Sequence, residues 1–388
     1  MRTTSYDGFG KLLVLADRKP AEDIGISDTS SSSHKIVVAV PDSIVDRSTI
    51  LSLVASYGSS SATAWLEFDR YRQIKESSFP PVQGYLERKR FVFAWGDPLV
   101  SFPDALKPTA EAFIAWVKSR NLRPIWCCVD HKFEQVLVLS LGWSGVMCIH
   151  EEVLHPDHVL QLTSDKGKGR ESIRLVKDLK NLRRATKAGV TSVEDRTEVG
   201  EGMLDWRRSK GLKGIQLAST TDQPWIDEEH RRYWVARSSL GHIVGVLLFT
   251  PIHGPHTYLI KNAISFPGSP RGISEHLIHT ALQYIQADEK RLGFHITVTF
   301  GMTASEHTTF VDSNDNLKSG RPGKSGRSGW RLTSPSKVYE QVAKGAGLLK
   351  RGEFRAKFDS EREEMYVCYP EDGLGLSGVK SLLAVLKK

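Results

Sequence analysis

The chain has 388 residues, enough for two domains of ordinary size, and its 40% hydrophobic and 25% charged residues are typical of a globular protein. No apolar run is long enough to span a membrane, and neither end carries a signal-peptide core or a lipidation motif. We therefore expect a cytoplasmic protein whose membrane contact would be peripheral, and the formal net charge of +8 suits a polyanionic partner.

The first 34 residues are polar and rich in serine, which predicts a flexible N-terminal arm. From residue 35 to 160, apolar runs that favour strands alternate with amphipathic stretches that favour helices. The expected strands lie at 11–15, 35–40, 62–68, 83–95, 123–129 and 144–150. The expected helices lie at 43–56, 106–120 and 131–141. This alternation predicts an α/β or α+β fold.

The second half, from residue 161 to 388, repeats the element order of the first, so we predict a duplicated fold of two lobes. The expected helices lie at 168–188, 200–210, 226–237, 273–290, 335–345 and 376–387. The expected strands lie at 242–250, 256–264, 294–300, 351–358 and 364–369. Residues 305–329 are poor in apolar residues and rich in Gly, Ser, Lys and Arg, which predicts a basic loop.

The segment 166–187, which includes most of the helix expected at 168–188, is unusually basic. Its apolar residues recur at a spacing of three, so one stripe would be buried and the cations would cover the rest. The cations are Lys166, Lys168, Arg170, Arg174, Lys177, Lys180, Arg183, Arg184 and Lys187. Such a face would bind the phosphates of an RNA in a salt-sensitive way, although a solvated face without a ligand is an equal alternative.

Two further segments could carry chemistry. The turn Ser269–Pro270–Arg271–Gly272 precedes a helix whose free N–H groups could hold a phosphate or an oxyanion, although a plain turn and cap explains these residues better. In the strand expected at 351–358, alternation would put Arg355 and Lys357 on one face, which suggests an anion or carbonyl site. The alternative there is an exposed edge strand.

Several kinds of active site are missing from the sequence. Gly320–Ser325 is too short for a phosphate-binding P-loop, no GxSxG elbow is present, and no HExxH motif or acidic cluster indicates a metal. The cysteines form no CxxC pair, so we predict buried reduced thiols and no bound metal or cofactor. These absences count against an NTPase, a serine hydrolase and a metalloenzyme.

Taken together, these segments resemble the C-terminal catalytic domain of the phosphatidylglycerol lysyltransferase family over about residues 35–388. The stretches that carry the resemblance are Gly84–Tyr85, Trp95–Leu99, Arg183–Val190, Ser269–Gly272, Phe300–Thr303, Phe354–Phe358 and Tyr366. Members of that family have two tandem GNAT-like acyltransferase lobes and transfer amino acids from aminoacyl-tRNA to lipids. The resemblance implies two such lobes here, each a mixed twisted sheet flanked by helices, at 35–160 and 161–388.

Free-standing versions of this domain are similar to the fungal ergosteryl–amino acid synthases, and the absence of a synthetase domain makes this chain look like the stand-alone glycine type. The resemblance then implies glycyl-tRNA as co-substrate, without a cofactor, and ergosterol in a membrane or lipid droplet as acceptor. One departure is that bacterial members carry Asp-Leu-Met-Arg before the turn, where this chain reads Leu259–Ile264 with no aspartate.

The implied reaction is transesterification, in which the sterol oxygen attacks the aminoacyl ester and the ribose leaves. Lys357 is our candidate to stabilise the oxyanion, and Arg355 is the second candidate or a phosphate clamp. Lys261 and Asn262 would touch the substrate amine or carbonyl. The general base would be Glu275 or His276. The alternatives are that the substrate amine takes the proton and that His276 is an ordinary surface residue. The expected pocket residues are Arg271, Gly272, Gly301, Met302, Thr303 and Tyr366.

The aromatic residues Trp225, Tyr233 and Trp234 could form walls of a sterol groove, although core packing explains them better. Lesser tRNA contacts are expected from the loop cations Lys318, Arg321, Lys324 and Arg327. Two other functions stay open at this point. One is an ordinary GNAT acyltransferase that uses acyl-CoA, which the partial pyrophosphate motif at Pro270–Ser274 disfavours, and the other is a non-catalytic RNA-binding protein.

Overall fold

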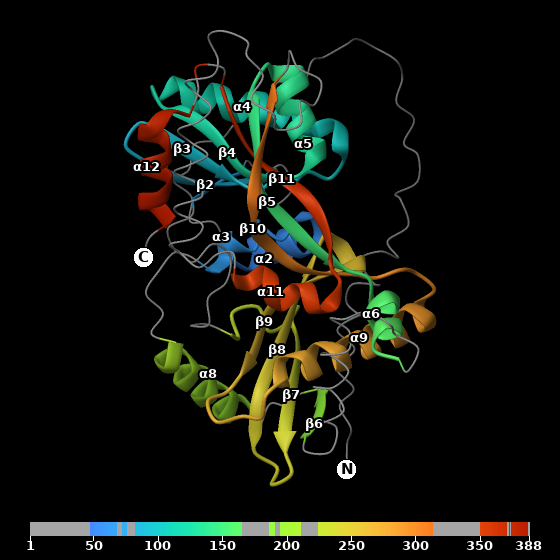
Figure 1. Cartoon of the computed structure of the whole chain (residues 1–388). Coiled ribbons are helices and arrows are strands. Elements are labelled where there is room, and N and C mark those ends of the chain that lie inside the picture. The colour runs from blue at the N-terminus through green and yellow to red at the C-terminus, as the bar shows by residue number, and fades with distance from the viewer. Residues whose placement is uncertain are drawn as a thin grey trace.

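The computed structural model describes residues 47–67, 72–75, 82–164, 186–190, 195–210, 224–312, 350–370, 372 and 374–386. The strands are β1 (Arg72–Lys75), β2 (Val82–Arg88), β3 (Phe91–Trp95), β4 (Arg123–Val129), β5 (Ser144–Leu154), β6 (Thr186–Val190), β7 (Arg232–Ser238), β8 (Ile243–Ile252), β9 (Thr257–Ser265), β10 (Thr297–Asp312) and β11 (Glu361–Tyr369). They form one continuous sheet of 11 strands in the order β1-β2-β3-β4-β11-β5-β10-β9-β8-β7-β6 (Figure 1). Only the pairs β3–β4 and β9–β10 are parallel, so the sheet is mixed.

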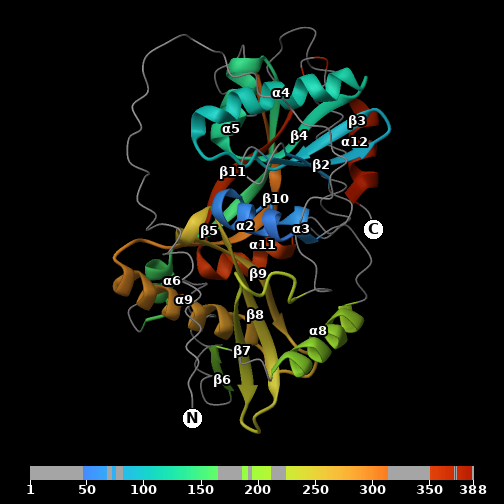
Figure 2. The ribbon, with the colours of Figure 1, turned by 180° about the vertical axis from the view of Figure 1, so that it is seen from behind.

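Helices cover both faces of this sheet. They are α2 (Arg47–Tyr57), α3 (Ala64–Glu67), η1 (Pro103–Ala105), α4 (Leu106–Ser119), α5 (His131–Gln135), η2 (Val136–Ser140), α6 (Pro156–Leu162), α8 (Arg196–Lys210), η4 (Gly254–His256), α9 (Ile273–Leu292), α11 (Lys350–Arg355), η5 (Ala356–Phe358) and α12 (Gly375–Leu386). At the centre of the molecule α11 lies on one side, and α2 and α3 lie on the other (Figures 1 and 2). No helix in these ranges combines the length and the apolar character that crossing a membrane requires.

The end of the chain returns to the first half. Strand β11 pairs with β4 on one side and with β5 on the other, both antiparallel. Helix α12 packs close to β2 and β3, where a side chain on Gly378 would touch Phe91. The first lobe therefore contains residues from both ends of the described chain.

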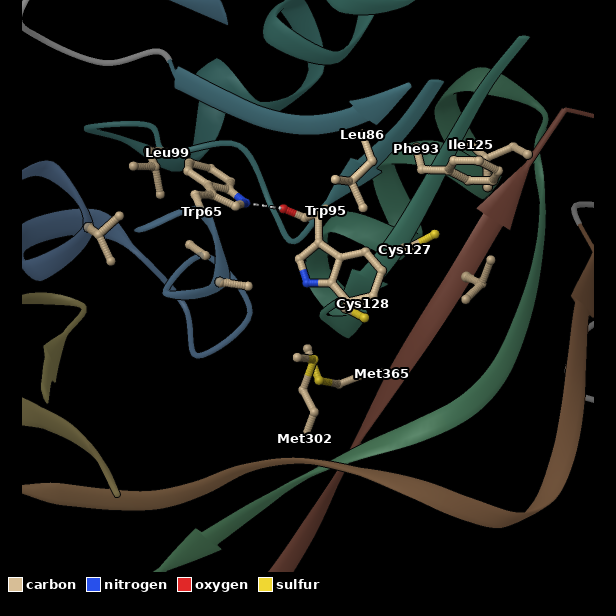
Figure 3. Packing of buried hydrophobic residues seen from close by; sticks show 14 of the residues in the cluster. Trp65, Leu86, Phe93, Trp95, Leu99, Ile125, Cys127, Cys128, Met302 and Met365 are labelled. Atoms are coloured by element: carbon tan, nitrogen blue, oxygen red, sulfur yellow. Dashed lines mark hydrogen bonds between the residues drawn. The ribbon is translucent and has the colours of Figure 1, made fainter. Parts of the chain in front are cut away.

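The largest core cluster spans the two halves (Figure 3). Trp65 and Trp95 lie in it, and the Trp65 indole N–H donates a 2.9 Å hydrogen bond to the Trp95 carbonyl. Met302 from β10 and Met365 from β11 pack in the same cluster, close to Cys128. Because residues from both halves share this buried apolar volume, it stabilises the junction of the lobes.

In the second lobe, alternate residues of the strands enter two separate clusters, as a sheet with both faces buried requires. On one face, Trp234 and Phe249 pack with the apolar side of α9. On the other face, Val246 and Leu248 pack with residues of α8, including Met203. This arrangement places the first turn of α9 on the face of β9 opposite to α8.

Most elements expected from the sequence are confirmed, including the strands 123–129 and 144–150 and the helices 106–120 and 273–290. The predicted α/β class with mixed sheets is also confirmed, although the sheets of the two halves join into one. The stretch 83–95 is a hairpin rather than one strand, because Lys89 turns the chain with a φ of 54°.

Four expectations are wrong. Ala64–Glu67, within the strand expected at 62–68, forms the short helix α3. Residues 232–238 form β7 rather than a helix, and β10 continues to Asp312, so 305–312 is not loop. Residues 350–358 are helical in α11 and η5 rather than a strand. The expected elements at 11–15, 35–40 and 335–345, most of 168–188, and the loop after 312 lie outside the described residues, and the division at residue 160 stays a prediction.

Candidate functional site

The two parallel strands β9 and β10 separate at the centre of the sheet. They pair only over Thr257–Leu259 and Thr297–Thr299. Directly afterwards the register of β9 with β8 shifts at Lys261, and the register of β10 with β5 shifts at residues 300–301. Bulges of this kind disrupt pairing and re-aim side chains, and they are enriched beside active sites. The place where the strands part is therefore our candidate site.

The bulge on β10 is fixed by Arg355. Its guanidinium is buried and donates hydrogen bonds to the carbonyls of Phe300 (2.8 Å) and Gly301 (2.9 Å), and to the hydroxyl of Thr303. Gly301 has a φ of +74°, and its N–H donates a 2.8 Å bond to the Thr299 hydroxyl. These bonds engage several of the N–H donors of the guanidinium inside the protein. Arg355 therefore holds the bulge and is placed poorly for the predicted phosphate clamp.

Arg355 and Lys357 do not share a strand face. Arg355 is the last residue of α11, and Lys357 lies in the single turn η5 that follows. Phe354 and Phe358, one helical turn apart, both pack on Phe300, with ring centroids 6.2 and 5.4 Å away. The alternation of apolar and charged residues therefore reflects a helical apolar face here, and the expectation that Arg355 and Lys357 share one face of a strand is wrong.

Lys357 forms an ion pair with Glu275. Its Nζ lies 2.5 Å from Oε1 of Glu275, which stands in the first turn of α9, after Gly272 at the helix cap. The Lys357 side chain is 25% exposed and the Glu275 side chain 8% exposed. A partly exposed ammonium held by a buried carboxylate can donate to a developing oxyanion without a large rearrangement. The structure thus brings together two of the predicted catalytic residues, whose roles remain predictions.

A second polar cluster lies on the other face of β9. The Lys261 ammonium donates a 3.0 Å bond to the Thr63 hydroxyl, and the Thr63 hydroxyl donates to the Ser60 carbonyl at 2.6 Å. Ile260, the neighbour of Lys261, packs among residues of α9 instead. Lys261 therefore faces the loop between α2 and α3, a contact between the two halves that its position in the sequence did not indicate.

Glu151 on β5 was not predicted as a site residue. Its carboxylate accepts a 2.5 Å bond from the Thr299 hydroxyl and another bond from the Ser60 hydroxyl. Burial raises the pKa of Glu151, and the two hydroxyls and the charge of Arg355 oppose that rise in part. In the sequence, the only signal was the polar run His150–Glu152 inside a mostly apolar strand.

The other candidate residues are spread over several environments. Asn262 and His276 are buried on β9 and α9, so His276 is not an ordinary surface residue, whereas Arg271 is exposed in the turn. Met302 belongs to the core cluster at the junction of the lobes. Tyr366 lies in the core of the first lobe, where its hydroxyl donates a 2.5 Å bond to Glu364, so it does not join the cluster at the separated strands.

The aromatic residues expected as groove walls face different sides of β7. Trp225 and Tyr233 lie with ring centroids 4.8 Å apart, and the Tyr233 hydroxyl donates to the Pro224 carbonyl. Trp234 is almost fully buried against Phe249 on the opposite face. Core packing accounts for all three of the predicted wall residues.

Of the nine cations expected to bind tRNA, eight lie outside the described residues, as do the four loop cations from Lys318 to Arg327. Lys187 lies on the strand β6, so the expected helix does not extend to residue 188. Within the ranges described, no group of three or more His, Cys, Asp or Glu side chains is arranged to hold a metal ion. All four cysteines are buried and free of disulfide bonds.

Comparison with protein-family models and with curated proteins finds no match for this chain. Among solved structures, it is similar to a C-terminal domain assigned to a lysylphosphatidylglycerol synthetase of Agrobacterium fabrum, with a TM-score of 0.63, 13% identity, and coverage of 87% of this chain and 96% of that one. It is similar to L-PGS of Bacillus licheniformis, with a TM-score of 0.62, 14% identity, and coverage of 88% and 98%. It is also similar to a Bacteroides thetaiotaomicron protein of unknown function, with a TM-score of 0.56, 9% identity, and coverage of 86% of this chain and 99% of that one. Over most of its length, the chain therefore has the fold of the lysylphosphatidylglycerol synthetase C-terminal domain.

Proposed function

We propose that this protein is an aminoacyl-tRNA-dependent aminoacyltransferase that esterifies a lipid hydroxyl. The observation that carries the proposal is the likeness to L-PGS, which spans 88% of this chain and therefore includes both lobes and the separated strands. The similar Agrobacterium fabrum domain is assigned to a lysylphosphatidylglycerol synthetase, a name that states the product, a lipid that bears a lysyl group. The ion pair of Lys357 and Glu275 beside the bulge supplies the polar groups that acyl transfer needs.

The proposed reaction exchanges one ester for another. The lipid hydroxyl oxygen attacks the carbonyl carbon of the aminoacyl ester, and a tetrahedral intermediate with a negative oxygen forms. The carbon–oxygen bond to the tRNA ribose then breaks, and the proton lost by the lipid hydroxyl ends on the ribose oxygen. Lys357 would stabilise the oxyanion or the leaving oxygen, while Glu275 holds the ammonium in place. Since one ester bond forms and another ester bond breaks, this step needs no ATP.

We further propose glycine as the amino acid and ergosterol as the acceptor. The support for this finer assignment is the resemblance of this chain to the fungal ergosteryl-glycine synthases. A sterol hydroxyl is uncharged and lies at a membrane surface, so an acceptor of this kind fits peripheral contact. The tRNA would be held by the basic segment 166–187, whose sequence carries nine cations.

The test is an incubation of the purified chain with glycyl-tRNA, labelled in glycine, and liposomes that contain ergosterol. Labelled lipid that depends on intact RNA supports the proposal, and liposomes with phosphatidylglycerol in place of ergosterol decide the acceptor. Label transfer from acyl-CoA without any transfer from charged tRNA would refute it, as would salt-sensitive tRNA binding without a lipid product. The matched variants are Lys357→Met, which should remove the product, and Lys290→Met, an exposed lysine near the end of α9, which should not.

A further inference from the structure

Three distant segments converge on the carboxylate of Glu151. Glu151 lies on β5, the strand between β11 and β10. It is paired with Met302 of β10 on one side and with Glu363 of β11 on the other. The Ser60 hydroxyl reaches it from the loop between α2 and α3, and the Thr299 hydroxyl reaches it from the last residue that β10 pairs with β9. Glu151 therefore lies where the two lobes meet and where the parallel strands separate.

The charge of this carboxylate is only partly compensated. Within the described part of the chain, Glu151 accepts bonds from two neutral hydroxyls and forms no ion pair. The negative charges of Asp97 and Glu363 are close enough to interact with it, and the charge of Arg355 acts with the opposite sign. A carboxylate offers about four acceptor positions, so two remain for another donor. Glu151 is half-buried, so a cation that arrives from outside can reach its free acceptor positions and form a charge-assisted hydrogen bond.

The donor substrate of the proposed reaction brings such a cation. An aminoacyl ester carries an α-ammonium group two bonds from the carbonyl carbon at which transfer occurs. We propose, on the basis of the proposed function, that Glu151 binds this α-ammonium, and that Ser60 and Thr299 orient its carboxylate. The carbonyl would then lie beside the bulge at Gly301, because the Thr299 hydroxyl contacts both Glu151 and the Gly301 N–H.

This assignment has a consequence for selectivity. The α-ammonium exists only on a charged tRNA with a free amine, so Glu151 distinguishes this donor from uncharged tRNA and from N-acylated tRNA. Glycine has no side chain beyond hydrogen, and its ammonium and ester carbonyl are the polar groups that a protein can recognise. For a glycine donor, the carboxylate would thus supply much of the discrimination between a charged and an uncharged acceptor end.

The test compares three forms of one tRNA by equilibrium binding to the full chain: glycyl-tRNA, glycolyl-tRNA in which a hydroxyl replaces the amine, and uncharged tRNA. A charge-assisted hydrogen bond predicts that glycyl-tRNA binds about tenfold or more tightly than glycolyl-tRNA. Equal binding of these two forms would overturn the assignment without touching the proposed function. Failure of all three forms to bind would instead overturn the proposed function, and the assignment with it.

Two variants locate the effect. Glu151→Gln keeps the size and one oxygen acceptor, and its NH2 can donate to the hydroxyl that loses its acceptor. This variant should bind glycyl-tRNA and glycolyl-tRNA equally, while its affinity for uncharged tRNA stays unchanged. Glu363→Gln removes an exposed carboxylate from β11, at the residue paired with Glu151. This variant should keep the preference of the wild type for glycyl-tRNA over glycolyl-tRNA. A preference retained in Glu151→Gln would refute the role of Glu151. Thr299→Val should raise the KM for glycyl-tRNA more than it lowers kcat, and Thr299→Ser should restore it.

Discussion

Replacement of Arg355 by methionine should destabilise the protein strongly, because this buried guanidinium supports the bulge on β10. The substitution keeps an unbranched apolar stem but removes the donors to the Phe300 and Gly301 carbonyls and to the Thr303 hydroxyl. Each buried polar group left without a partner costs about 1–3 kcal/mol. The two carbonyls alone therefore give roughly 2–6 kcal/mol, and since relaxation recovers part of this, we expect a loss of about 3 kcal/mol.

The measurement is urea denaturation followed by tryptophan fluorescence, with the free energy of unfolding taken from the midpoint and slope. A loss of about 3 kcal/mol is a large part of the total stability of a typical domain, so the midpoint should move clearly. Arg355→Lys keeps the charge but loses the planar arrangement of donors, and it should fall between wild type and Arg355→Met. Arg208→Met, which removes an exposed arginine paired with Asp205, is the control and should change stability by less than about 0.5 kcal/mol. An unfolding free energy for Arg355→Met within about 0.5 kcal/mol of wild type would show that the guanidinium does not support the bulge.

Four further outcomes are expected. Lys357→Met should abolish product in the labelled-lipid assay while tRNA binding persists in a filter-binding assay, and lost binding would assign Lys357 to the RNA instead. Gly301→Ala should lower the unfolding free energy by about 1–2 kcal/mol in urea denaturation, because φ is +74° and the new Cβ would lie 2.9 Å from Leu259. Burial raises the pKa of Cys148 to about 12 and raises those of the other cysteines, so mass spectrometry should find no alkylation of the native protein at neutral pH, and modification of all four only after unfolding. Burial raises the pKa of Glu151 above its value in the unfolded chain, so ionisation of this carboxyl destabilises the folded protein as the pH rises above about 4. The unfolding free energy of Glu151→Gln should therefore exceed that of the wild type by an amount that grows from about pH 4 to pH 7. A difference that does not depend on pH would contradict the shift.

The sequence predicts well those elements whose apolar pattern is compatible with only one kind of secondary structure. The run Ile125–Val129 is too short and too continuously apolar for a helix, and it is β4. The stretch from Ile273 carries apolar residues at helical spacing after a proline–glycine turn, and it is α9. In both cases local propensity and burial agree, so tertiary contacts do not override the pattern.

The segment 354–358 shows why the rest was harder. Phe354 and Phe358 are separated by four residues, a spacing that satisfies a strand with period two and a helix with period 3.6 equally well. Only the packing of both rings on Phe300, more than forty positions earlier in the chain, selects the helix. A short apolar run therefore leaves its secondary structure open until its tertiary partner is known.

The candidate site was predictable only in part. Lys357 and Glu275 were both chosen from the sequence, yet their ion pair joins residues 82 positions apart and no local pattern indicates it. Glu151 and Ser60 are 91 positions apart, and neither lies in a recognisable motif. Partners of this kind become visible when the sheet topology brings β5, β10 and the α2–α3 loop together.

The insertion of β11 between β4 and β5 has a consequence for synthesis on the ribosome. Without Glu361–Tyr369, the described strands would divide into two sheets, one from β1 to β4 and one from β5 through β10 to β6, with open edges at β4 and β5. Open edges pair readily with other chains, so a nascent or truncated protein that lacks this strand is exposed to aggregation. The join between the lobes, and with it the surroundings of Glu151, therefore depends on β11, and a chain cut before Glu361 would leave the facing edges of β4 and β5 unpaired.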